Sequence, residues 1–427
     1  MSSAGVSPAL RPPPGNPRFP LFDSARAIGA LAILLAHVAS LAPWMTTTWV
    51  GSLFNGLSVG VWIFFAVSGF LLYRPFVAAR AAGRPGPRLG DFARRRVLRI
   101  VPAYWLALTV VSLWPGEPYV TGPFTHDWWR YFGFLQIYGS GYREHGLAVA
   151  WSLCVEVTFY ALLPFYAIGV RRLSRTVGWK VAEIGPLIAI AALGLTVRGL
   201  CANQVLSWAW SPTLLGSMQF FTVGMGLAVA SVALHGRPVR SGVGKVLLRR
   251  VEWSWALAFA AFLIASTVFD YFQVHSYPPW LQVTGNDALG MATALFVIFP
   301  AVFGTSLGGL PRRILASRLL SWLGVVSYGI FLWHVPLLGW LIGADYSTAR
   351  GLGPRSPLVR GLPHFVSDHV LLAALGSTLA LSVGAAALSY YFVELPFLRL
   401  KERRLLAFFR GTAGEPEPRP VLPTPPG

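Results

Sequence analysis

Residues 25–43 read ARAIGALAILLAHVASLAP, an apolar run that contains one arginine, Arg26, and one histidine, His37. A run of this length is long enough to cross a bilayer as a helix. The two side chains are separated by about three helical turns, so they lie on one face, roughly 16 Å apart along the axis. Ionisable groups inside a membrane are costly unless they face a cavity or a protein interior. We therefore expect Arg26 and His37, with the imidazole near mid-depth, to belong to a functional site.

The composition of the whole chain is that of a membrane protein. Of its 427 residues, 55% are hydrophobic and 12% are charged, about half the charged fraction of a soluble protein. Lipid offers the backbone no hydrogen bonds, and the alternating pattern of a membrane barrel is absent, so the spans must be helices. The sequence predicts an all-α, polytopic integral membrane protein with about ten transmembrane helices. The predicted spans are 25–43, 53–73, 97–114, 149–169, 181–200, 214–234, 253–271, 288–306, 319–342 and 370–391.

The placement of arginine and lysine predicts the orientation. With the N-terminus inside, the basic clusters at 74–96, 171–180, 237–250, 312–318 and 399–404 all fall in inner segments. This follows the positive-inside rule and puts both termini in the cytoplasm and the protein in the plasma membrane. The net charge of +19 is therefore mainly a topology signal. No loop is long enough to form a basic domain that binds nucleic acid.

The chain is predicted to be one membrane domain, residues 21–400, between two tails. Residues 1–20 are Pro-rich and residues 401–427 are basic and then Pro-rich, so we expect the first tail to be disordered and the second to lie in the cytoplasm. The first apolar run is too long for a cleaved signal peptide. Cys154 and Cys201 show neither metal-ligand nor disulfide spacing, and we expect no metal.

Two features mark the second span and the basic segment that follows it. Gly56 and Gly60 form a small-xxx-small pair, which predicts a close helix contact. Ser68 lies in FFAVSGF (64–70), outside any G-x-S-x-G elbow, which argues against a nucleophile.

The segment DFARRRVLRIVPAYW (91–105) carries an arginine cluster into the third span. Arg96 and Arg99 share a helix face, and a pair of guanidinium groups suits a phosphate ligand. Anchoring to lipid headgroups explains the cluster equally well, and for Arg94 it is the preferred interpretation.

The fourth span opens with AWSLCVEVTFY (150–160). Ser152, Glu156 and Tyr160 recur every four residues and form one polar stripe. A buried carboxylate is either protonated or paired with a cation, and His37 and Arg26 are the expected partners of Glu156. A purely structural role, joining helices, is the alternative.

Further polar residues occur late in the chain. Ser327 and His334 share a face of the ninth span, where His334 is either a site residue or a packed, hydrogen-bonded one. Glu394 is expected to lie at the inner membrane edge, near the inner arginines. Arg198 and Asp287 fall near outer helix ends and are predicted to be solvated.

The membrane histidine, the buried glutamate and the arginine pair fit two kinds of chemistry. An imidazole is suited to deprotonate a hydroxyl near neutral pH, and arginines would hold an anionic donor, which together suit acyl transfer to an alcohol. A proton-coupled transporter or exporter of a small molecule would use the same histidine and glutamate as a proton relay. The physical argument leaves both open.

A set of motifs in order from about residue 20 to 400 resembles the membrane-bound acyltransferase-3 family, whose members O-acylate glycans, lipids and secondary metabolites. The first-helix arginine and histidine match Arg26 and His37. The other matching segments are 60–72, Arg96-x-x-Arg99, Trp151-Ser152-Leu153 with Glu156, Phe159 and Tyr160, Ser327-Tyr328 to Trp333-His334, and Val393-Glu394-Leu395-Pro396. Trp62 is a departure, because relatives often carry an acidic residue there.

The resemblance implies an acyltransferase that moves an acyl group, most simply acetyl, from cytoplasmic acyl-CoA to a hydroxyl of a glycan, glycolipid or glycosylated metabolite of the cell envelope. The donor is a substrate, and no permanent cofactor is expected. His37 would be the catalytic base, supported by Glu156 and Arg26. Phosphate groups of CoA would contact Arg95, Arg96 and Arg99. Substrate contacts are expected at Ser68, Trp151, Ser152, Tyr160, Tyr328, His334 and Glu394.

Overall fold

Long helices make up most of the described chain, which in this computed structural model comprises residues 19, 21–42, 44, 48–113, 127–139, 146–234, 252–269, 277–303, 310–342 and 368–400. Within these ranges there is no strand. The long helices are α1 (Leu21–Ala39), α3 (Val59–Ala81), α4 (Leu89–Ser112), α6 (Ala150–Val177), α7 (Trp179–Ala202), α8 (Leu214–Ala233), α10 (Glu252–Val268), α11 (Pro279–Val302), α13 (Arg318–Ile342) and α14 (Asp368–Ser389). The short ones are α2 (Trp49–Gly56), α5 (Trp128–Phe132), η3 (Gln136–Tyr138), η4 (Trp208–Trp210), α12 (Leu310–Leu315), η5 (Tyr390–Glu394) and α15 (Leu395–Leu400).

The all-α, polytopic membrane class predicted from the sequence is confirmed. Each of the predicted spans falls on one of the long helices, and 8 segments of the described chain are long and apolar enough to cross a membrane. The predicted spans 97–114 and 253–271 are not among these segments. The first half of α4 carries the arginine cluster, and the apolar part of α10, Trp253–Val268, is short. Both predicted tails lie outside the described residues.

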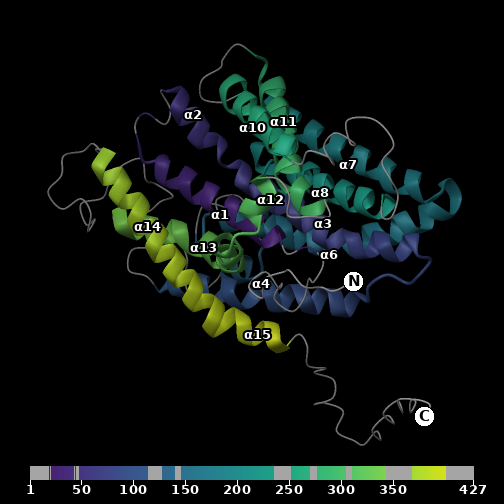
Figure 1. Ribbon diagram of the computed structural model, residues 1–427, viewed down its shortest axis with the longest axis horizontal. Helices are drawn as coiled ribbons and strands as arrows, with labels where there is room; N and C mark the ends of the chain where they lie inside the picture. The colour runs from purple at the N-terminus through teal and green to yellow at the C-terminus, as the bar shows by residue number, and fades with distance from the viewer. Residues whose placement is uncertain are drawn as a thin grey trace, which may run out of the picture.

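Helix α1 occupies the middle of the bundle, between α3 and α13, and α14 covers the other side of α13 (Figure 1). The contact between α1 and α3 is close because glycines face each other there. A Cβ atom on Gly60 would lie 2.4 Å from the carbonyl oxygen of Gly29, a distance that no side chain tolerates. The close helix contact predicted for Gly56 and Gly60 is therefore confirmed, although the two glycines meet different helices: Gly60 faces α1, and Gly56, at the end of α2, faces Ser266 of α10.

The contact between α3 and α8 is the most extensive in the bundle and is also formed through glycine. A Cβ atom on Gly224 would lie 1.7 Å from the carbonyl oxygen of Ala66. Beside this crossing, the rings of Phe65 and Phe221 stack with centroids 4.5 Å apart. These buried aromatic side chains belong to the main core cluster, and their packing holds α3 between α1 and α8.

Arginine side chains gather at one end of the bundle, which we call the basic end. It contains Arg74 and Arg80 near the end of α3, Arg95 and Arg96 in the first half of α4, and Arg171 near the end of α6. Arg74, near the end of α3, lies over the ring of Phe19, just before α1, at 4.9 Å. Arg80 of α3 donates to Glu183 at the start of α7, from Nε to Oε1 at 2.7 Å, and to the carbonyl of Ala167 on α6. Glu183 is fully buried, so this ion pair joins α3, α6 and α7 in the protein interior.

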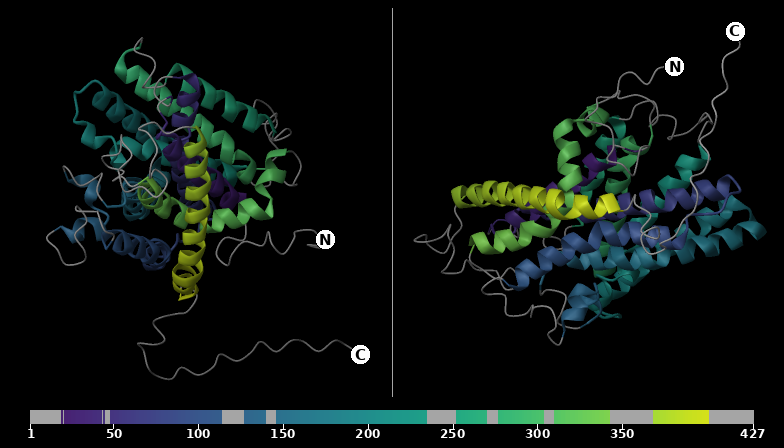
Figure 2. Two further views of the ribbon diagram at one scale, coloured as in Figure 1. Left: turned by 90° about the vertical axis from the view of Figure 1, so that its left-hand side faces the viewer. Right: turned by 90° about the horizontal axis from the view of Figure 1, so that it is seen from below.

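The last helices form one continuous rod along the side of the bundle, from α14 through the π-helical η5 to α15 (Figures 1 and 2). Segments η5 and α15 pack on α4. A π-helical turn widens the helix locally and is common at functional positions. Here it contains Glu394, which is buried, and whose carboxylate interacts electrostatically with Arg99 of α4.

Candidate functional site

A small cavity of about 60 Å³, which we call the central pocket, lies where five helices meet. Two of its side chains are basic and one is acidic, in a part of the protein where most neighbours are apolar. The volume accommodates a few water molecules or a group the size of an acetyl. The pocket is lined by Arg26 of α1, Phe64, Phe65 and Ser68 of α3, Arg99 and Ile100 of α4, Ser152, Leu153, Glu156 and Tyr160 of α6, and Ser327, Tyr328 and Phe331 of α13.

Glu156 is the acidic residue of the central pocket, and two hydroxyl groups hold it. Ser68 Oγ of α3 and Tyr160 OH, one turn further along α6, both donate to Oε1 of Glu156. The polar stripe of α6 arises from the four-residue spacing, and Ser152, Glu156 and Tyr160 all line the pocket. The carboxylate thus has a fixed position against α3, which differs from the pairing with His37 that the sequence predicted.

Two arginines, Arg26 and Arg99, line the pocket, and a third, Arg96, lies beside it; of the three, only Arg26 has an ion pair within the described chain. Arg26 Nη1 lies 3.2 Å from Asp23 Oδ1. Arg96 lies over the ring of Tyr160 at 5.8 Å, and its buried Nε has no hydrogen-bond partner among the described residues. Arg99 lines the pocket and likewise forms no ion pair there. The three guanidinium groups are close enough to repel one another electrostatically, with Glu156 as an attracting charge.

His37 and His334 form a pair farther along α1 and α13. His334 Nε2 lies 3.2 Å from His37 Nδ1, although the two residues are 297 positions apart in the chain. His334 is fully buried, whereas His37 is half-buried. His37 lies in the last turn of α1, nearer the helix end than the predicted mid-depth position, because α1 begins and ends four residues earlier than the predicted span.

The contacts of the pair determine which nitrogen carries each proton. His334 Nδ1 faces the carbonyl oxygens of Ile330 and Phe331 at 3.1 and 2.9 Å, so it must be the protonated, donating nitrogen. In the neutral ring Nε2 is then an acceptor, and it accepts from His37 Nδ1–H, which also faces the carbonyl of Ile33. The lone pair of His37 is therefore on Nε2, the nitrogen that can accept a proton from a substrate.

An aromatic pair lies between the histidines and the central pocket. Phe64 and Phe331 both line the pocket and pack edge to face, with ring centroids 5.9 Å apart. The ring of Phe331 also lies 5.9 Å from the ring of His334. Arg26 lines the central pocket and His37 does not, so this apolar layer separates the surroundings of the two residues that the sequence grouped in one site.

Of the remaining predicted residues considered next, only Tyr328 lines the central pocket. Tyr328 lines the central pocket and donates from its hydroxyl to the carbonyl of Ile100 at 2.9 Å. Trp151 lines a different, larger cavity. Glu394 is buried next to Arg99, and its Oε1 has no hydrogen-bond partner among the described residues. Arg95 is half-buried on α4 and does not line the pocket.

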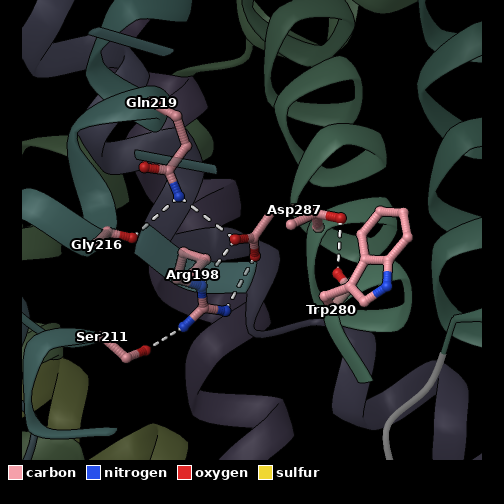
Figure 3. Close-up of polar contacts among 7 residues, drawn as sticks. Arg198, Ser211, Gly216, Gln219, Trp280 and Asp287 are labelled. Carbon is pink, nitrogen blue, oxygen red and sulfur yellow. Dashed lines mark hydrogen bonds and ion pairs between the residues drawn. The ribbon is translucent and has the colours of Figure 1, made fainter. Parts of the chain in front are cut away.

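The sequence reasoning missed a buried charge pair at the end of the bundle opposite the basic end. Arg198 of α7 donates from Nε and Nη2 to the two carboxylate oxygens of Asp287 of α11, at 2.7 and 3.0 Å (Figure 3). Asp287 is 1% exposed, so the prediction that both residues are solvated is wrong. Asp287 lies more than two turns inside α11, and in an apolar helix that depth alone is a signal that a carboxylate has a partner.

Comparisons with known proteins identify relatives of this chain. The chain is 24% identical over 396 residues to the putative peptidoglycan O-acetyltransferase YrhL of Bacillus subtilis, covering 88% of this chain and 54% of the relative. It is 24% identical over 337 residues to the peptidoglycan O-acetyltransferase OatA of Listeria monocytogenes, covering 75% and 49%, and 27% identical over 347 residues to nodulation protein 10 of Rhizobium leguminosarum, covering 76% and 84%.

The chain thus spans about half the length of the first two of these relatives. No solved structure matches it. The family model described as an acyltransferase domain matches residues 20–394, a range that contains every predicted site residue. The protein belongs to this family of membrane acyltransferases.

Proposed function

We propose that this protein transfers an acetyl group from acetyl-CoA, bound at the basic end, to a hydroxyl group of a glycan or glycosylated molecule. His37 Nε2 takes the hydroxyl proton while the oxygen attacks the thioester carbonyl. The C–O bond forms, the C–S bond breaks, and the thiolate leaves with the proton that the imidazole holds. The products are the O-acetyl ester and free CoA.

The observation that carries the proposal is the fixed tautomer of His37. An imidazole with Nδ1–H held by a partner and a lone pair on Nε2 is the arrangement that a general base needs. His334 supplies that hold from a fully buried position. A proton accepted on Nε2 of His37 would be stabilised because Nδ1–H then donates more strongly to His334.

The donor side of the proposal is supported by the arginines. Guanidinium groups without an ion pair are costly in an apolar environment, and Arg96 and Arg99 both lack one among the described residues. A ligand with phosphate groups would supply the missing charge and the forked hydrogen-bond geometry that arginine prefers. Acyl-CoA carries phosphates at one end and the thioester at the end of a long, flexible arm.

The dimensions of the site support an extended donor. The distance along α1 from Arg26 to His37 is about 16 Å, so the phosphates and the reacting carbonyl are widely separated. The central pocket is large enough for an acetyl group but not for a sugar ring, which suits the passage of the small group alone. Ser68 and Tyr160, which hold Glu156, line the pocket.

The acceptor class follows from the relatives. Two of them are named peptidoglycan O-acetyltransferases, which supports a hydroxylated glycan as the acceptor here. With the basic end in the cytoplasm, as the charge distribution predicts, the donor binds from the cytoplasm and the acceptor approaches from the other side. The half-buried position of His37 near the far end of α1 fits that approach.

The proposal is tested with the full chain in nanodiscs, acetyl-CoA, and N-acetylchitotriose as a neutral soluble glycan. We expect free thiol to appear together with acetylated sugar. His37→Ala is expected to lower kcat by about 100-fold or more, while Ser174→Ala, which changes an exposed hydroxyl on α6, leaves it unchanged. Normal turnover by a folded His37→Ala protein would overturn the base assignment. Transport of the sugar without thiol release would overturn the acyl transfer and favour a transporter.

A further inference from the structure

A second cavity opens at the end of the bundle opposite the basic end, and its volume is about 350 Å³. It lies among the start of α3, the start of α6, the end of α7, η4 and the start of α8. This volume is in the range of sites that enclose a small organic ligand. It is several times larger than the central pocket, so the two cavities suit ligands of different size.

Aromatic rings form much of the wall of this outer cavity. Trp62 of α3 stacks on Phe220 of α8 with centroids 4.7 Å apart and an interplanar angle of 8°. Trp151 of α6 and Trp208 of η4 complete the aromatic lining. Flat aromatic faces pack against the C–H faces of a sugar ring, and they do so without requiring charge on the ligand.

The two charged groups at the outer cavity already form an ion pair with each other. Arg198 lines the cavity, but both arms of its guanidinium fork are occupied by Asp287, and Nη1 donates to Ser211 Oγ (Figure 3). Gln219 Nε2 donates to Asp287 Oδ2 at 3.3 Å and to the carbonyl of Gly216 at 3.0 Å. The buried pair therefore adds no net charge, and an anionic ligand gains little from this cavity. Ser58 and Ser217 also line the cavity, and their hydroxyl groups are uncharged hydrogen-bonding groups.

The outer cavity adjoins the central pocket. Phe65 lines both cavities. Trp151 lines the outer cavity and the next residue, Ser152, lines the pocket. Val61 lines the outer cavity and packs against the cluster formed by Ile33 and Phe331, one helical turn from the histidine pair. A ligand in the outer cavity is thus next to the path that the acetyl group would follow.

We propose that the outer cavity is the acceptor subsite and binds an uncharged sugar ring between Trp62, Trp151 and Trp208. Arg198 acts as a positioning residue that keeps Ser211 and the Trp208 face in place. Its guanidinium lies 5.6 Å from the centre of the Trp208 ring. The inference rests on the proposed acetyl transfer to a glycan, and it adds the location of the acceptor and the requirement that the bound ring be neutral.

The test compares two tryptophans of the same short helix. Trp208 and Trp210 are both 47% exposed, but only Trp208 lines the outer cavity. The full chain is placed in nanodiscs, because glycoside detergents would compete, and binding of N-acetylchitotriose is measured by saturation-transfer NMR. We expect Trp208→Ala to weaken binding about tenfold, Trp208→Phe to restore most of it, and Trp210→Ala to leave it unchanged.

A matched pair of ligands tests the charge requirement. Methyl β-glucoside is expected to bind, and methyl β-glucuronide, which differs by a carboxylate, is expected to bind more weakly. Equal effects of Trp208→Ala and Trp210→Ala, or tighter binding of the glucuronide, would overturn the inference.

Turnover separates this inference from the proposed function. In the thiol-release assay, Trp208→Ala should raise the KM for the sugar and leave the KM for acetyl-CoA unchanged. Sugar binding that depends on Trp208 without any thiol release would support the subsite and contradict the acetyl transfer. Thiol release with an unchanged KM for the sugar in Trp208→Ala would support the transfer and contradict the subsite.

Discussion

The central pocket and the outer cavity both have arginine in an apolar environment, but the positive charge of the arginine is balanced in different ways. In the outer cavity Arg198 is held bidentately by Asp287, which is almost fully buried. Around the central pocket Arg96 and Arg99 form no ion pair among the described residues. A paired arginine holds helices together, whereas an unpaired one in the same kind of environment indicates that a ligand supplies the missing charge.

This comparison assigns opposite tasks to the two regions. The pair of Arg198 and Asp287 is a structural element beside a neutral cavity, and removing one partner should cost stability. Arg96 and Arg99 form no ion pair among the described residues, and removing one of them should cost ligand affinity more than stability. The predictions below are ordered by the size of the expected effect.

The largest effect is expected at the buried pair. Asp287→Ala leaves the guanidinium of Arg198 without its partner, and we expect the free energy of unfolding to fall by about 3–5 kcal/mol. The measurement is the midpoint of thermal unfolding in nanodiscs. The control is Asp91→Ala, which removes a half-buried carboxylate at the start of α4, and it should shift the midpoint much less.

A double variant sharpens this prediction. Arg198→Met combined with Asp287→Leu removes both charges and fills the space, so it should recover most of the lost stability. If the single variant Asp287→Ala unfolds at the same temperature as the unmodified protein, the pair is not structural and the contrast between the two cavities fails.

A smaller effect is expected at the histidine pair, which Phe64 and Phe331 separate from the central pocket. His334→Leu removes one of the two acceptors of His37 Nδ1–H and leaves the carbonyl of Ile33. We expect kcat to fall by about tenfold, because the proton that His37 accepts on Nε2 loses the stabilising contact with His334. The KM for acetyl-CoA should stay unchanged. His334→Gln offers a carbonyl oxygen to the same N–H and should restore part of the rate, which a purely packing role for His334 would not predict.

Much of the fold and part of the site could be predicted from the sequence. Hydropathy locates the spans, and helical spacing places Ser152, Glu156 and Tyr160 on one stripe that lines the central pocket. The small residue Gly60 indicates a close helix contact, although its partner Gly29 is found only in the structure. These features depend on residues near one another in the chain, which is why periodicity reveals them.

Contacts between distant helices could not be obtained in this way. His37 meets His334, and Arg198 meets Asp287, through helix packing that no local pattern encodes. Glu156 illustrates the same limit. Its charge indicated a partner, but only the fold shows that Ser68 and Tyr160 hold its carboxylate while His334 takes the place expected for it beside His37.

The most direct test of the central claim is the binding of CoA and of pantetheine, its phosphate-free end, to the full chain in nanodiscs by calorimetry. We expect CoA to bind more tightly than pantetheine, and Arg99→Gln to weaken CoA binding about tenfold while leaving pantetheine binding unchanged and shifting the unfolding midpoint less than Asp287→Ala does. The control is Arg171→Gln, which removes an exposed arginine at the basic end and should change neither affinity. If CoA and pantetheine bind equally well, or if Arg99→Gln weakens both to the same extent, the unpaired arginines do not hold the phosphates of the donor.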